Sequence, residues 1–154
     1  MFLLNGNGSK IVYSLKASVI SFGVAGLLAV IIDLVFGLPS DAPMYALTVA
    51  DILGAVIFSP VIETLLLAAI LVFINKFTEH VILSACLCAL VFSLLHSMVF
   101  PLWGVITFVP FVIFGIAFQI WKLTSTKAGV QVACFIHALN NGYVVLVGMA
   151  SEIS

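Results

Sequence analysis

Charged residues are scarce in this sequence. The 154 residues include five lysines, no arginine and six acidic residues, so only 7% are charged while 64% are hydrophobic. A water-soluble domain of this size needs charged and polar side chains over most of its exterior, so the composition excludes one. A net charge of -1 without arginine also excludes a nucleic-acid-binding surface. The sequence therefore indicates an integral membrane protein whose main partner is the lipid bilayer.

Cysteine is also scarce, and its positions exclude two further kinds of protein. The three cysteines are Cys86, Cys88 and Cys134, and all of them lie within apolar runs. No two are separated by two residues, which is the spacing typical of a zinc site or a redox motif. We interpret them as small buried hydrophobic residues, not as a disulfide framework.

The apolar runs predict an all-α, polytopic membrane protein that forms a single domain over residues 1–154. We expect five spans, at about 17–38, 44–75, 81–99, 102–121 and 128–149. The second run is too long for one straight crossing, because about 32 residues would extend about 48 Å across a core of about 30 Å. Ser59 suits a helix N-cap and Pro60 the first helical position, so we expect a break there, with Glu63 in the first turn beyond it. Pro110 is expected to kink the fourth span.

The lysines predict the orientation of these spans. With five crossings, all lysines fall on one side, and Asp41 and Glu152 fall on the other. A sixth crossing would scatter the lysines over both sides. Because positive residues are enriched in cytoplasmic loops, we expect the lysine side and the N-terminus to be cytoplasmic.

Three ionisable residues lie deep within the predicted spans, where such residues are rare and often functional. Glu63 belongs to "PVIET", His96 to "FSLLH" and His137 to "HALNN". Counted along the helices from the lysine side, they lie roughly 18, 22 and 14 Å deep, respectively. One helical turn separates Phe92 from His96, and another separates His137 from Asn141. Three different spans therefore bring polar groups to one central band of the bilayer.

This set of side chains can support hydrolysis. Glu63 could act as a general base, with a neighbouring imidazole to orient a water molecule. His137 and Asn141 could donate hydrogen bonds to an oxyanion. The same glutamate and two histidines could instead hold a zinc ion, with water as the fourth ligand. Two other interpretations remain: the groups could only hold helices together, with Asn140 among them, or they could relay protons or ions.

At these residues the sequence resembles the CAAX protease and bacteriocin-processing family, also called Abi or type II CAAX prenyl endopeptidases. The resemblance covers residues 59–142. The family pattern is a glutamate pair followed by arginine, then Phe-x-x-x-His, then His-x-x-x-Asn/Asp, each on its own transmembrane helix. Glu63 matches the first glutamate, "FSLLH" supplies His96, and "HALNN" supplies His137 and Asn141. The sequence departs from the pattern at Thr64 and Ala68, where the second glutamate and the arginine would stand.

The resemblance implies an intramembrane endopeptidase. Glu63 and His96 would activate water, and His137 with Asn141 would form the oxyanion site, with Phe92, Thr64 and Asn140 in support. Members are described both as metal-free glutamate proteases and as metalloproteases, and we favour the metal-free form. The substrate would be a peptide or lipidated protein at the membrane, and the location a cell membrane, which we expect to be a bacterial inner membrane. A non-catalytic immunity or scaffold protein of the same family is the alternative.

Overall fold

The computed structural model describes residues 2–37 and 48–153, with side chains as far as Ala150. These residues form helices and short connections, with no strand among them. Five of the helices in this described part are long and apolar enough to cross a membrane, as the sequence predicts. The elements are η1 (Phe2–Leu4), α1 (Lys10–Phe36), α2 (Val49–Leu53), the π-helical turn η2 (Gly54–Phe58), α3 (Ser59–Ile74), α4 (Val81–Val99), α5 (Pro101–Lys122) and α6 (Thr126–Ile153). The chain is a multi-pass helical membrane protein.

The helix ends follow from local sequence. α1 begins at Lys10, earlier than the predicted residue 17, because the Ser9 side chain accepts a hydrogen bond from the Val12 N–H and caps the helix. α4 has the predicted bounds, and α5 begins one residue early, at Pro101, because proline suits the first helical turn. Pro110 lies inside α5, which remains one helix through it.

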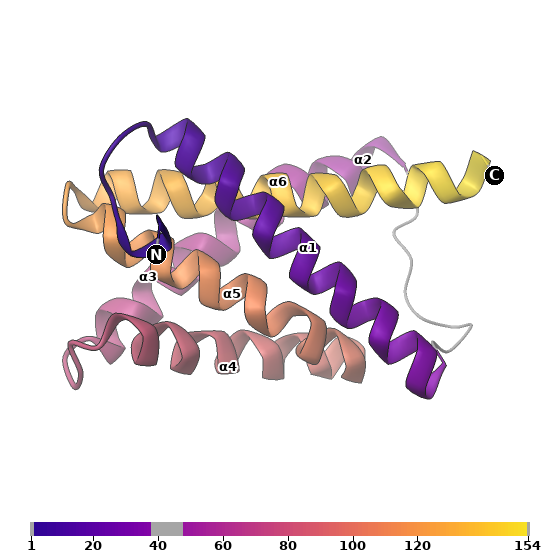
Figure 1. The fold of residues 1–154 in the computed structure, drawn as a ribbon, viewed down its shortest axis with the longest axis horizontal. Helices are drawn as coiled ribbons and strands as arrows, with labels where there is room; N and C mark the ends of the chain where they lie inside the picture. Colours follow the sequence, from indigo (N-terminus) through magenta and orange to yellow (C-terminus); the bar gives the residue numbers. More distant parts are fainter. Residues whose placement is uncertain (1, 38–47, 154) are drawn as a thin grey trace.

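The lysine-bearing segments all lie at one end of the bundle. In Figure 1 the N-terminal residues, the α3–α4 connection and the α5–α6 connection lie together at the left, and the α4–α5 junction lies at the right. Lys10 Nζ donates to Gln131 Oε1 at 3.4 Å, which joins the starts of α1 and α6. Two acidic residues, Asp41 and Glu152, were predicted for the opposite end. Asp41 and the side chain of Glu152 lie outside the described part of the chain. We call the left end of this view the lysine end.

The exterior of the bundle is apolar, because it faces lipid instead of water. Leu34 is 81% exposed and Leu94 is 61% exposed. Many other large aliphatic side chains on α1, α3 and α4 are exposed as well. The core consists mainly of aromatic and small residues, which let helices approach closely. For example, a Cβ at Gly115 of α5 would lie 3.2 Å from the Cβ of Ala85 of α4.

The break predicted at Ser59–Pro60 takes the form of a π turn: α3 begins at Ser59, but the span continues through it. Residues Val49–Ile74 form one continuous helical span with the π-helical turn at Gly54–Phe58. Ser59 has helical backbone angles, φ -59° and ψ -50°, and its N–H bonds the Gly54 carbonyl five residues back. Pro60 has no N–H to donate, and widening the turn accommodates that loss without ending the helix. Ser59 is therefore not an N-cap, and Glu63, the fifth residue of α3, lies beyond the first turn.

Candidate active site

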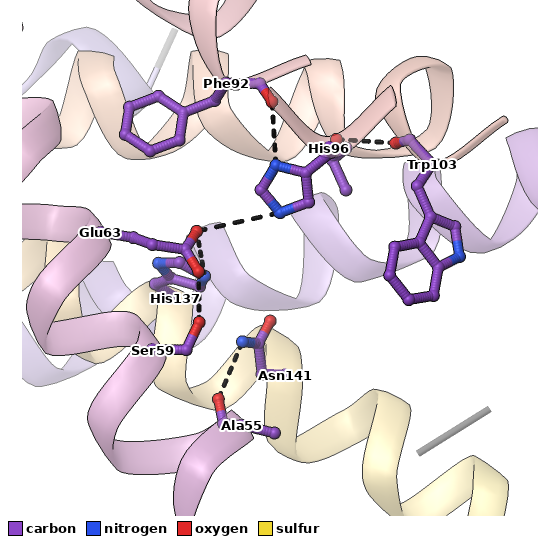
Figure 2. Close-up of polar contacts among 9 residues, drawn as sticks. Ala55, Ser59, Glu63, Phe92, His96, Trp103, His137 and Asn141 are labelled. Carbon is purple, nitrogen blue, oxygen red and sulfur yellow. Dashed lines mark hydrogen bonds and ion pairs between the residues drawn. The ribbon is translucent and has the colours of Figure 1, made fainter. Parts of the chain in front are cut away.

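The three ionisable residues predicted to meet do lie together. Glu63 comes from α3, His96 from α4 and His137 from α6 (Figure 2). The Oε2 atom of Glu63 lies 3.9 Å from the Nε2 atom of His96 and 3.9 Å from the Nε2 atom of His137. That oxygen is buried and makes no hydrogen bond within the described part of the chain. One carboxylate oxygen therefore faces two imidazole nitrogens at distances that suit a shared bridging molecule.

The hydrogen bond of His96 to its own helix determines its tautomer. Its Nδ1 lies 2.9 Å from the Phe92 carbonyl oxygen, one turn earlier in α4. A carbonyl only accepts, so Nδ1 must carry the proton and donate it. In the neutral ring the lone pair is then on Nε2, the atom that faces Glu63 (Figure 2). The contact of Phe92 with His96 is therefore through its backbone carbonyl as well as within the aromatic cluster.

Ser59 is a site residue that the sequence argument assigned wrongly. Its hydroxyl donates to the Oε1 atom of Glu63, one helical turn away. This bond holds one carboxylate oxygen and leaves Oε2 directed at the histidines (Figure 2). The i, i+4 spacing of Ser59 and Glu63 could have indicated the contact, but the expected N-cap assigned the hydroxyl to the backbone instead.

Aromatic rings fix the histidines. The His137 ring stacks on Phe114, with centroids 4.7 Å apart and planes at 23°, and meets Phe111 edge-on at 5.5 Å. Phe111 also lies 5.2 Å from the His96 ring and stacks on Phe92 at 4.3 Å. His137 is only 4% exposed, so its ring is almost fully enclosed. α5 thus contributes no ionisable group to the cluster of Glu63 and the two histidines, but its phenylalanines hold both imidazoles in place.

The polar cluster lines a cavity of about 620 Å³. This volume is within the range of 300–1,000 Å³ that is typical of ligand pockets. Its lining includes Ser59, Glu63, His96 and His137, together with apolar side chains from five helices. The side chains of Glu63 and His96 are 24% and 26% exposed, so parts of both face the cavity.

Asn141 lines the same cavity, but one of its amide hydrogens already has a partner. Its Nδ2 donates to the Ala55 carbonyl, in the π turn, at 2.9 Å (Figure 2). In a helix, that carbonyl would accept from Ser59 or Pro60. The Ser59 N–H bonds Gly54 instead, and Pro60 has no N–H. The Asn141 amide therefore replaces the missing backbone donor, which leaves its second N–H for the predicted oxyanion role.

This contact predicts a measurable coupling between Asn141 and Pro60. We expect Asn141→Ala to lower the free energy of unfolding by about 1–2 kcal/mol, because it leaves a buried carbonyl without a donor. In a Pro60→Ala background, which returns an N–H to the helix, the same substitution should cost less. Unfolding of the four proteins of this double-mutant cycle in detergent micelles measures the difference. Equal costs in both backgrounds would contradict the assignment.

The remaining predicted residues differ in their surroundings. Asn140 lines the cavity, and its Oδ1 accepts a hydrogen bond of 2.9 Å from the Ser21 hydroxyl of α1. It therefore helps to hold α1 against α6. Thr64 is 1% exposed and does not line the cavity. It shares the buried face of α3 with Ala68, one turn later, so both positions where the family has charged residues lie in packed core.

The zinc alternative concerns Glu63, His96 and His137. Among the described residues no group of three or more His, Cys, Asp and Glu side chains is arranged to hold a metal ion. The two Nε2 atoms nevertheless face the same carboxylate oxygen, so the residue types fit a zinc ligand set.

No family model, no curated protein and no solved structure matches this chain. The resemblance to the CAAX protease and bacteriocin-processing family consequently rests on the three motifs alone. The geometry of the site stands independently of that resemblance.

Proposed function

We propose that the chain is an intramembrane endopeptidase that uses water activated by Glu63 and His96. The main support is the placement of one buried carboxylate oxygen 3.9 Å from the Nε2 atoms of two histidines, at a cavity large enough for a peptide segment. A site of this kind needs both a group that accepts the proton of water and a group that stabilises the developing negative charge. The residues around the cavity include both kinds.

The proposed reaction begins with a water molecule bonded to Glu63 Oε2 and His96 Nε2. As its oxygen attacks the carbonyl carbon of the scissile peptide bond, Glu63 takes one proton. The carbonyl oxygen becomes an oxyanion, which accepts hydrogen bonds from His137 and from the second N–H of Asn141. The C–N bond then breaks, and the proton held by Glu63 passes to the leaving amine. The products are a carboxylic acid and an amine, and no covalent enzyme intermediate forms.

The two histidines are suited to different roles. The Nδ1–H of His96 is committed to the Phe92 carbonyl, so its Nε2 is an acceptor in the neutral ring. His137 is held by aromatic rings and has no side-chain partner on Nδ1 within the described residues. Its Nε2 can therefore carry the hydrogen and act as the donor to the oxyanion. The proposal includes a cell membrane, specifically a bacterial inner membrane, as its location.

Peptide cleavage in proteoliposomes tests the proposal. The purified protein is reconstituted and given a panel of membrane-anchored peptides with varied apolar sequences, and products are identified by mass spectrometry. We expect cleavage at a defined bond that 1,10-phenanthroline does not inhibit. Loss of cleavage with the chelator, restored by zinc, would support the metal-dependent alternative. No cleavage of any peptide, with a proton current through the same liposomes, would overturn the proposal in favour of a carrier.

A further inference from the structure

The cavity occupies only part of the bundle, on the side of the ionisable residues away from the lysine end. Along α6, its lining begins at His137, about 17 Å from the start of the helix at Thr126, and continues to Gly148, about 33 Å from it. Along α4 it runs from Phe92 to Val99, the last residue of that helix. The cavity thus extends from the polar cluster toward the end of the bundle that carries no lysine.

The opposite half of the bundle is tightly packed. Leu71 of α3, Phe118 of α5 and Ala133 of α6 are all 0% exposed, and they lie between the histidines and the lysine end. Trp121 is 4% exposed and packs edge-on against Tyr13 of α1, with ring centroids 5.5 Å apart. A peptide could not pass through this core without displacing several aromatic side chains. Approach from the lysine end is therefore blocked.

Beyond the polar cluster, the walls of the cavity are mainly apolar. Trp103, Ile106 and Val144 line it there, on α5 and α6. Thr107 also lies in this part, but its hydroxyl donates to the Trp103 carbonyl at 2.7 Å, so its hydrogen is not available to a ligand. A peptide with its scissile carbonyl at Glu63 would place neighbouring side chains against these walls. Apolar side chains fit there, whereas a charged one would be buried without a partner.

We propose that the substrate is an extended peptide with apolar side chains beside the scissile bond, and that it reaches Glu63 from the end of the bundle opposite the lysines. This inference rests on the proposed function for the identity of the ligand. The route itself depends only on the position of the cavity. If the lysine end is cytoplasmic, the substrate arrives from the outer leaflet or the outer aqueous phase.

Cysteine labelling from one side of the membrane tests the route without any activity. In a background with Cys86, Cys88 and Cys134 replaced by alanine, single cysteines are introduced at three positions. Thr107→Cys lies in the cavity, Thr124→Cys marks the exposed lysine end, and Leu94→Cys faces lipid. Spheroplasts and inverted vesicles are treated with a membrane-impermeant methanethiosulfonate. In one of the two preparations the reagent cannot reach Thr124→Cys at the lysine end. We expect Thr107→Cys to react at least ten times faster in that preparation than in the other.

The outcomes separate the route from the function. A cavity cysteine that reacts from the same side as Thr124→Cys, or that is as unreactive as Leu94→Cys, would overturn the proposal. Val144→Cys provides a second cavity position if Thr107→Cys does not accumulate, because the Val144 side chain also lines the cavity. The apolar preference is tested with the unchanged protein and variant peptides. In these peptides, aspartate replaces an apolar residue beside the cleaved bond. Cleavage that is unchanged by this exchange would contradict the substrate class while leaving the peptidase intact.

Discussion

Glu63→Gln is expected to lower kcat/KM for peptide cleavage by about 10²–10⁴, the usual contribution of a general base. Glutamine has nearly the same shape, and its amide oxygen can still accept the Ser59 hydroxyl that now bonds Glu63 Oε1. It cannot take a proton from water, so the loss should appear in kcat and not in folding. The measurement is the cleavage rate in proteoliposomes, with unfolding in detergent as the test of intact structure.

The neighbouring residue provides a matched control. Thr64→Val changes the next residue of the same helix, in packed core outside the cavity, and keeps the shape of the side chain. It should leave the cleavage rate within about twofold, because it touches neither the water nor the imidazoles. Full activity in Glu63→Gln would rule out the proposed base. Equal losses in both variants would indicate a general disturbance of α3 instead.

Thr64→Glu is expected to destabilise the protein by about 3 kcal/mol, although it restores the second glutamate of the family pattern. Thr64 is 1% exposed, and the residue one turn later is Ala68, which offers no cation. The new carboxyl group would be buried without a partner, next to a site that already contains Glu63. The free energy of unfolding in detergent micelles, compared with that of Thr64→Val, measures the effect.

A double variant shows whether the core could hold the ion pair of the family. Thr64→Glu with Ala68→Arg supplies both charges, but Ala68 is 8% exposed within the hydrophobic core. Because the core is packed around an alanine there, we expect overpacking to add to the loss of stability. A double variant as stable as the wild type would show that the bundle still has room for the pair. That result would strengthen the resemblance to the family beyond its three motifs.

Much of the fold and the central contact of the site could be predicted from the sequence. Pro101 marks the start of α5 within one residue of the prediction, because proline suits the first turn of a helix, where its missing N–H costs nothing. Glu63, His96 and His137 could be expected to meet, because buried ionisable groups at one depth satisfy one another. Local chemistry and depth within the bilayer are both readable from residue positions.

The rest depended on tertiary contacts that spacing does not reveal. The π turn is stabilised by Asn141, which follows Ala55 by 86 residues in the chain. Without that donor, the loss of the Pro60 N–H favours a break, so the prediction of a break was physically reasonable. Because a break was expected, the Ser59 hydroxyl was assigned to the helix N-terminus and not to Glu63. The direction of the cavity depends on which large side chains fill the lysine end. Hydropathy does not predict this packing, because it assigns similar values to all large apolar residues.

The π turn also determines which changes of length the second span can tolerate. Deleting one residue from Gly54–Phe58 would let the segment wind as a regular α-helix, and the residues before it would keep about the same face toward the bundle, because a π turn takes up one extra residue without a change of phase. The contact between the Ala55 carbonyl and Asn141 depends on the widened turn, so it would be lost. A substitution that made the turn α-helical at full length would instead rotate the preceding residues by about 100° relative to α3. We therefore expect related sequences that lack the extra residue to lack both the π turn and the asparagine contact.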